Sequence, residues 1–285
     1  MSVAGGVPRA VERAVVHRCD ALQIFAKNAN QWKGRPLPSD EVRQFRSAVE
    51  SAGLKAVVSH ASYLINLATT DAALRAQSRD AMGDELDRAE ALGLLGAVLH
   101  PGAYTSGSPA EGLRLVASNL LDLVEARPAG HTMVLLECTA GQGSALGARF
   151  EELAEIIRLM EGHPRVGVCL DTCHLLAAGY DLASAHGYAD TFTQFGRTVG
   201  FDRLKVFHVN DSKKPLGSRV DRHEHIGDGH LGLEAFRRLV NDPRFAHLPM
   251  LLETPKGEGK PTGPIGVDPL DARNLETLRA LVVHP

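Results

Sequence analysis

The feature that most constrains the fold is a series of short apolar segments, each ending at a histidine or an acidic residue. The segments cover residues 54–59, 95–99, 133–136, 166–170, 204–207 and 250–252. The residues that follow them are His60, His100, Glu137, Asp171, His208 and Glu253. Neighbours in this series are 40, 37, 34, 37 and 45 positions apart, which leaves room for one strand and one helix each. The pattern predicts parallel strands joined by crossover helices.

A closed barrel explains this pattern better than an open sheet does. In a doubly wound open sheet only a few strand ends meet at the switch point, whereas a barrel brings all of them to one rim. We therefore predict an α/β fold, a (β/α)8 TIM-type barrel, as a single domain over residues 1–285. Helices are expected over 8–18, 39–52, 70–92, 109–126, 149–161, 182–199, 234–241 and 268–283.

The strand count is one short of the eight that such a barrel needs. The first readable strand is 21–27, which ends without a ligand, and only residues 1–7 precede the helix that starts at Pro8. We expect the first strand to be truncated at the N-terminus, through a mis-assigned start or a shortened chain. The alternative is a natural seven-stranded or partly open barrel.

Three further ligand-type residues stand close behind the strand ends: His174, Asp221 and His223. A single histidine or acid at a strand end is more often a hydrogen-bonded structural group, so only the set is informative. Imidazoles and carboxylates bind zinc or manganese, and the lack of cysteine among them argues against a structural zinc site. Because one zinc takes about four ligands, nine side chains with some bridging favour two or three metal ions.

Composition limits the binding partners and the compartment. The net charge of −3 gives no global attraction to a polyanion, so nucleic-acid binding would need a local basic surface. The loop that carries Asp221 also holds Lys213, Lys214, Arg219 and Arg222, which suit a phosphate-bearing substrate, although a charged run is usually just solvated surface. No signal peptide, membrane-length apolar run or disulfide pattern is present, so we expect a cytoplasmic protein without membrane contact.

Several motifs together resemble one family across nearly the whole chain. They are HASYLIN (60–66), HPG (100–102), LLECTAGQG (135–143), VGVCLDTCH (166–174), HVNDSKKPLGSRVDRHEHIG (208–227) and LLETP (251–255). The sequence is similar to the endonuclease IV family of abasic-site DNA endonucleases. The resemblance implies three zinc ions, with manganese or iron as alternatives at one or more sites.

The resemblance also divides the nine ligands among the metals. The first metal is assigned to His60, His100 and Glu137. Asp171, His208 and Glu253 share the second with a bridging Glu137, and the third is assigned to His174, Asp221 and His223. Glu137 and Glu253 are the catalytic candidates, since either could accept a proton during hydrolysis.

The implied substrate is double-stranded DNA with abasic sites or blocked 3′ ends, cleaved by a monomer. Hydrolysis on the 5′ side of the lesion leaves a 3′-hydroxyl and a 5′-deoxyribose phosphate. By the same resemblance Tyr63, Leu64 and the KNANQW loop (27–32) enter the DNA stack, and Asn30 stands where family members carry arginine. Lys213, Lys214, Arg219 and Arg222 are the expected phosphate contacts.

Two other functions stay open at this stage. A sugar isomerase or epimerase could use a similar metal-bearing barrel, although nine ligands and the SRVDRHEHIG loop speak against it. A lesion-binding protein that no longer cleaves is the second alternative, because loss of a strand removes core packing and exposes sheet edges.

Overall fold

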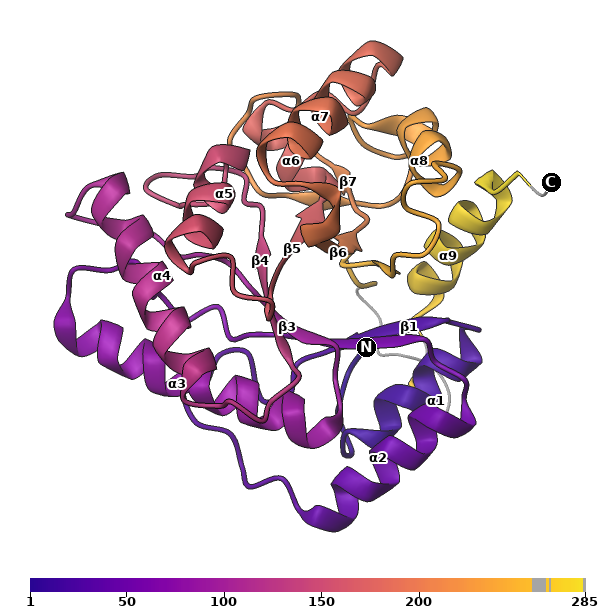
Figure 1. Ribbon diagram of the computed structural model, residues 1–285. Helices are drawn as coiled ribbons and strands as arrows, with labels where there is room; N and C mark the ends of the chain where they lie inside the picture. Colours follow the sequence, from indigo (N-terminus) through magenta and orange to yellow (C-terminus); the bar gives the residue numbers. More distant parts are fainter. Residues whose placement is uncertain (258–264, 267, 284–285) are drawn as a thin grey trace.

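A parallel sheet of seven strands forms the centre of the computed structural model, which describes residues 1–257, 265–266 and 268–283 (Figure 1). The strand order follows the chain, and every neighbouring pair is parallel. The strands are β1 (Ala21–Ile24), β2 (Ala56–His60), β3 (Gly96–Leu99), β4 (Met133–Glu137), β5 (Val166–Asp171), β6 (Leu204–His208) and β9 (Met250–Leu251).

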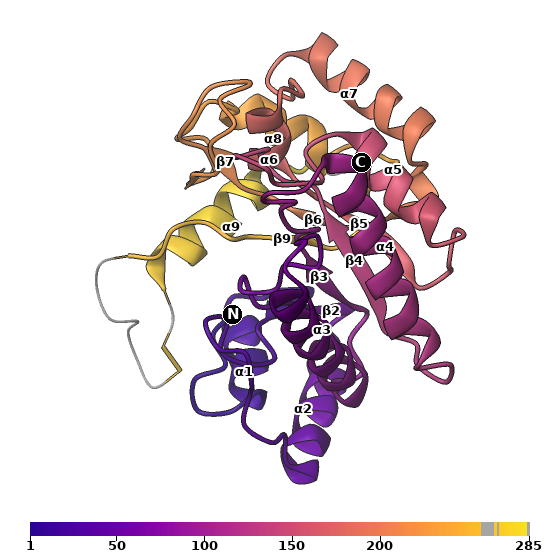
Figure 2. The same cartoon turned by 90° about the vertical axis from the view of Figure 1, so that its left-hand side faces the viewer.

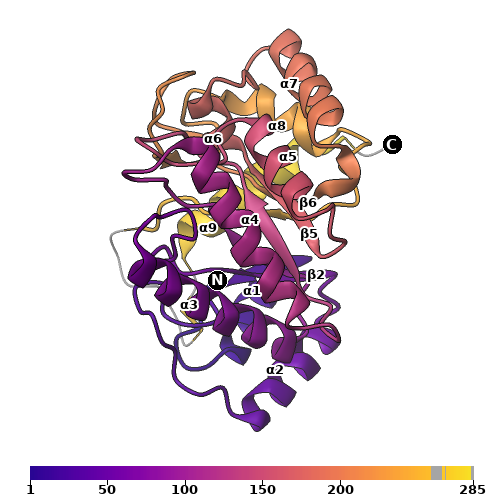
Figure 3. The same cartoon turned by 60° about the vertical axis from the view of Figure 1, so that its left-hand side comes forward.

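Helices surround this sheet on its outer side (Figure 1). They are α1 (Pro8–Val16), α2 (Ser39–Ser51), α3 (Ala72–Leu92), α4 (Pro109–Glu125), α5 (Phe150–Leu159), α6 (Thr172–Ala178), α7 (Ala185–Thr198), α8 (Gly232–Val240) and α9 (Pro269–Leu281), with a short 3-10 turn at Phe201–Arg203. Figures 2 and 3 show α3 and α4 lying side by side on the flank of β2 to β4. The predicted strand–helix alternation and barrel class are thus confirmed.

Local sequence signals explain where the longest helix begins and ends. The Asp71 carboxylate accepts hydrogen bonds from the backbone amides of Ala73 and Leu74, which caps the first turn of α3. At the other end Gly93 adopts a left-handed conformation with φ of 72°, which an L side chain would resist. These two residues place the helix within two residues of the predicted 70–92 range.

Two layers of apolar side chains pack on the two faces of the strands. The inner layer fills the barrel, as expected for strands whose side chains alternate between faces. It consists of Val58, Val98, Leu135, Cys169, Val206 and Leu251. The outer layer joins strands to helices and includes buried residues such as Leu99, Leu136 and Phe207. With the barrel filled, the polar strand-end residues gather at its carboxyl-end rim.

The barrel has one seam, between β1 and β9. Residues of these strands lie close together, but no backbone ladder joins them in the described part of the chain. The described residues ahead of α1 form turns, and the Met1 amine donates a hydrogen bond to the Gln23 carbonyl at 2.6 Å. The prediction that residues 1–7 hold no complete strand is confirmed.

Three details differ from the sequence predictions. The strand expected at 21–27 ends at Ile24, and the helix α6 directly after Asp171 was not predicted. The basic loop after β6 contains a small antiparallel ladder between β7 (Asp211–Ser212) and β8 (His223–Glu224). No described helix combines the length and the apolar composition needed to cross a membrane.

Candidate metal centre

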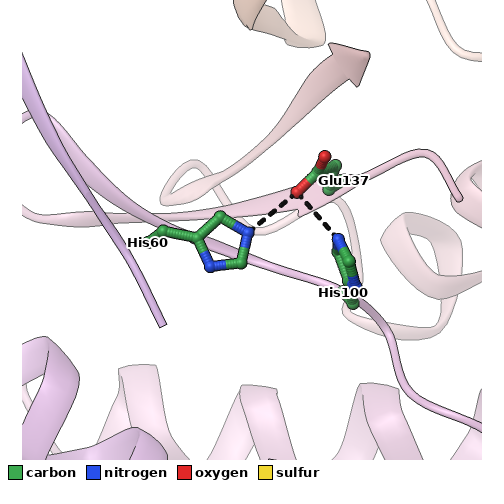
Figure 4. Close-up of side chains that lie close together, drawn as sticks. All are labelled: His60, His100 and Glu137. Carbon is green, nitrogen blue, oxygen red and sulfur yellow. Dashed lines mark hydrogen bonds and ion pairs between the residues drawn. The ribbon is translucent and has the colours of Figure 1, made fainter. Parts of the chain in front are cut away.

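The carboxylate of Glu137, at the end of β4, is the middle of the site. One of its oxygens, Oε2, lies 3.1 Å from His60 Nε2 and 3.2 Å from His100 Nε2. Figure 4 shows the two imidazoles approaching this oxygen from different sides. The other oxygen, Oε1, lies 3.0 Å from His208 Nδ1 and 3.3 Å from His174 Nδ1. Glu137 therefore connects side chains from β2, α6, β6 and the loop after β3.

A second cluster surrounds His208 at the end of β6. Its Nδ1 lies 3.1 Å from Glu253 Oε2 and 3.9 Å from Asp171 Oδ2, in addition to its contact with Glu137. The four side chains each offer a ligand atom, and these atoms all lie within 4.8 Å of one another. The predicted second ligand set is thus assembled in space, with Glu137 in position to belong to two sets.

The third cluster joins α6 to the loop after β6. His174 Nε2 is 3.2 Å from Asp221 Oδ2, and His223 Nε2 is 3.3 Å from Asp221 Oδ1. Cys173 also lies near Asp221 and His223, which sequence reasoning did not predict. Burial raises the pKa of the Cys173 thiol to about 12, so without a cation beside it this side chain is a thiol.

The donor set fits divalent cations. Glu137 and Asp171 are completely buried, and a buried carboxylate needs a compensating positive charge. The Nε2 atoms of His174 and His223 are buried and have no hydrogen-bond partner, although both face Asp221. Unpartnered buried nitrogens beside carboxylate oxygens suit zinc or manganese.

Electrostatics agree with this interpretation. Burial disfavours the charged form of Glu137, but the charges of His208 and His100 hold the pKa of that carboxyl well below its usual range. Burial also opposes charge on His174, yet the carboxylate of Asp171 raises the pKa of His174 well above its usual value. Glu137 thus stays ionised and attracts positive charge to the site.

Backbone carbonyls fix the orientation of several imidazoles. The Nδ1 of His60 contacts the Ala61 carbonyl at 2.7 Å, and that of His174 contacts the Cys138 carbonyl at 2.9 Å. His223 Nδ1 contacts the Glu253 carbonyl at 3.1 Å. When Nδ1–H donates to a carbonyl, the lone pair of Nε2 faces the cluster, which is the arrangement that metal-binding histidines usually show.

Polar residues directly behind the ligands were missed by sequence reasoning. Asn210 is completely buried, donates to Asp171 Oδ2 at 2.6 Å and accepts from the Glu253 amide at 2.7 Å. The buried carboxylate of Asp211 accepts from the backbone amides of Gly227, Gly229 and Leu231 in the loop before α8, and from that of Gly232 at the start of α8. No sequence signal distinguishes Asn210 and Asp211 from the polar residues that ordinarily follow a strand.

The predicted DNA contacts separate into two groups. Tyr63 is 58% exposed and, with Lys213 and Arg222, lines a cavity of 430 Å³ above the ligands. Its ring centroid lies 5.1 Å from that of His60. The exposed side chains of Lys214 and Arg219 do not line this cavity.

Two other residues predicted to insert into DNA do not line this cavity. Leu64 is half-buried next to Tyr63, while Asn30 is exposed on a turn that the Asn28 side chain caps at 2.9 Å. Chemically, the site combines nine ligand-type side chains with an open cavity that has basic residues at its edge, which suits a phosphodiester substrate.

Comparisons with known proteins agree with this fold and site. A family model described as Xylose isomerase-like TIM barrel matches residues 11–279. The D-psicose 3-epimerase structure with D-fructose shares this fold, with a TM-score of 0.69, 15% identity and coverage of 98% of this chain and 93% of that chain. The fold and site thus define a xylose isomerase-like barrel with a metal-binding rim.

Other relatives are much more similar. "Probable endonuclease 4" of Chloroflexus aurantiacus is 49% identical over 282 residues, which is 99% of this chain and 96% of that protein. The protein of the same name from Trichlorobacter lovleyi is 50% identical over 281 residues, covering 99% and 97%. The crystal structure of endonuclease IV from Thermus thermophilus has a TM-score of 0.84 and 38% identity, covering 99% of this chain and 96% of that one. The chain belongs to the endonuclease IV family.

Proposed function

We propose that this chain is a metal-dependent DNA repair endonuclease that hydrolyses the phosphodiester on the 5′ side of abasic sites. The products would be a 3′-hydroxyl and a 5′-deoxyribose phosphate, and the same site would remove blocking groups from damaged 3′ ends. The observation that carries the proposal is the set of nine ligand-type side chains that includes Glu137, beneath a cavity edged by Lys213 and Arg222.

The three clusters would each hold one cation. His60, His100 and Glu137 would hold the first; Asp171, His208 and Glu253 would hold the second together with Glu137; and His174, Asp221 and His223 would hold the third. Zinc is the proposed occupant, with manganese or iron as alternatives. When bound, such ions lower the pKa of water, orient the phosphodiester and neutralise charge on the attacking and leaving oxygens.

The side chains of this chain have the remaining roles. Glu253, whose side chain is 17% exposed, can accept a proton at the edge of the cavity, whereas the completely buried Glu137 is better suited to hold charge in place. Tyr63 stands at the cavity edge, where it can contact a nucleotide displaced from the duplex. An abasic nucleotide has lost its stacking and pairing, so its displacement costs less than the few kcal/mol of an intact one.

The two alternatives are less well supported. The epimerase structures share the fold at low identity, whereas the relatives named endonuclease 4 are about half identical along the whole chain. A protein that binds lesions without cleaving is also disfavoured, because the seven-stranded barrel brings all nine predicted ligands together.

Incision of a labelled duplex with a single tetrahydrofuran abasic analogue tests the proposal. We expect one cut on the 5′ side of the analogue and no cut in the matched intact duplex. Full chelation should stop cleavage, and added zinc or manganese should restore it. Unchanged cleavage by metal-free protein, or turnover of a free ketose without incision, would contradict the proposal.

A further inference from the structure

The strand β1 contributes to the site without supplying a ligand. The residue that faces the cluster from β1 is Gln23, which lies opposite Val58 in the pairing with β2. Its Oε1 lies 2.8 Å from His208 Nε2, and its Nε2 donates to Glu253 Oε1 at 2.5 Å. Both arms of this amide are therefore in contact with residues of the second cluster.

The two hydrogen bonds specify one arrangement of protons. An amide oxygen only accepts and an amide nitrogen only donates. Because Gln23 Nε2 must donate to the Glu253 carboxylate, its Oε1 faces His208 and accepts from the Nε2–H of that ring. When a cation takes the place of the Nδ1 proton, the ring is neutral with its hydrogen on Nε2, and Nδ1, which lies 3.0 Å from Glu137 and 3.1 Å from Glu253, carries the lone pair that binds the cation.

The same contacts orient Glu253. Its Oε1 accepts from Gln23, so its other oxygen, Oε2, is the one that faces His208 Nδ1. The side chain of Glu253 is 17% exposed, so packing alone restrains it less than it restrains the completely buried Glu137. One amide thus directs two ligand atoms to the same point in space.

His208 differs from His60, His174 and His223 in the kind of group that orients its ring. His60, His174 and His223 are oriented by backbone carbonyls, which no substitution removes. The partner of His208 is a side chain and can be replaced. The Gln23–Glu253 hydrogen bond also connects β1 to the segment after β9, across the seam where no backbone ladder is present among the described residues.

We infer that Gln23 is a positioning residue for the second metal, which holds His208 in the tautomer with a free Nδ1 and holds Glu253 in its ligand orientation. This inference rests on the proposed metal centre. It predicts that the second site loses affinity when the amide is removed, while the sets around His60 and His174 do not change. Loss of such an outer partner commonly lowers metal affinity by about 10–100-fold.

Zinc titration against a chromogenic chelator tests this inference with Gln23→Met, which keeps the length of the side chain and removes both hydrogen bonds. We expect one of the zinc ions to bind about 10–100-fold more weakly and the others to bind as before. In the incision assay kcat should fall while KM for DNA stays close to its original value. Gln44→Met is the matched control, because Gln44 is exposed on α2 and far from the site in sequence and fold.

A second variant separates positioning from mere structural support. Gln23→Glu can still accept from His208 but cannot donate to Glu253, and it adds a negative charge beside that carboxylate. We expect Gln23→Glu to keep the His208 tautomer in ring-nitrogen NMR spectra and Gln23→Met to lose it. If Gln23→Met fails to fold, zinc binding by Gln23→Glu still decides.

Wild-type affinity for every zinc ion in Gln23→Met, or in Gln23→Glu if Gln23→Met does not fold, would overturn the inference. Failure of the proposed function is a different result, because it would appear in the unmodified protein as fewer bound metals or absent incision.

Discussion

Replacement of Lys27 by methionine tests how the loops after β1 and β2 are held in place beside the site. The Lys27 ammonium is buried at the start of the loop after β1, where its side chain is 1% exposed. It contacts Asp84 at 3.0 Å and Glu85 at 3.5 Å on α3, and donates to the Trp32 carbonyl at 3.3 Å. Glu85 in turn accepts from the Ser62 amide at 3.2 Å. One buried ion pair thus supports both loops that we expect to contact DNA.

The magnitude follows from burial. The pair with Asp84, whose side chain is 39% exposed, contributes only about 0–1 kcal/mol. Glu85 is 1% exposed, and removing one partner of a buried pair costs about 3–5 kcal/mol because the other charge stays uncompensated. At about 2 °C or more per kcal/mol, the melting temperature of Lys27→Met should fall by about 6 °C or more.

Urea unfolding of the metal-free protein, followed by circular dichroism, measures this loss. Lys33→Met in the same loop is the control, because Lys33 is exposed, and its free energy of unfolding should change by less than about 0.5 kcal/mol. A loss below about 1 kcal/mol in Lys27→Met would refute the reasoning, since it would mean that the buried pair is close to neutral for stability.

The same variant has a pH signature. Burial raises the pKa of Glu85 above its usual value even beside Lys27. A carboxyl whose folded pKa is raised stabilises the fold below the unfolded pKa and loses that contribution as pH rises through the folded pKa. Without Lys27 the pKa of Glu85 should rise further. The free energy of unfolding of the variant should therefore be closer to that of the original protein at about pH 5 than at about pH 8. An equal loss at both values would argue against an ionised Glu85.

Three further outcomes are expected. His223→Ala should lose one metal ion and most of the incision rate while its circular dichroism spectrum stays unchanged; full metal content would contradict the third ligand set. Burial opposes ionisation of Asp242, but hydrogen bonds from Arg244 lower the pKa of this carboxyl below its usual value. Its contribution to the free energy of unfolding is therefore present above the unfolded pKa and is lost as pH falls through the folded pKa. Asp242→Asn should therefore destabilise the protein by about 1 kcal/mol at neutral pH and by less in acid, as measured by urea unfolding at several pH values. DNA binding should weaken steeply as salt rises, and Lys213→Ala should reduce the slope of that dependence by about one.

The barrel and the ligands were accessible from sequence because each ligand follows an apolar strand directly. Parallel strands bring their carboxyl ends to one rim, so Glu137 and Asp171 could be placed together without any structure. The third ligand set required the family resemblance, since Asp221 and His223 lie in a loop whose path the sequence pattern does not fix.

Other features depend on contacts between distant segments. The helix α6 is short and is capped by the carboxylate of Asp171, which accepts a hydrogen bond from the His174 amide. Its seven residues are too few for a clear helical periodicity in the sequence. Gln23 looked like an ordinary polar position in a strand without a ligand, because its partners lie 185 and 230 residues further along the chain. Asn210 was hidden for the same reason, since it joins Asp171 to the Glu253 backbone.

The number of metal ions per chain tests the central claim most directly. Elemental analysis by plasma mass spectrometry on protein purified without chelators or added metal, normalised to protein sulfur, gives this number. The three clusters of ligand side chains predict three ions per chain, with zinc as the main element. One ion per chain, in a protein that is folded and monodisperse, would contradict the three-metal centre.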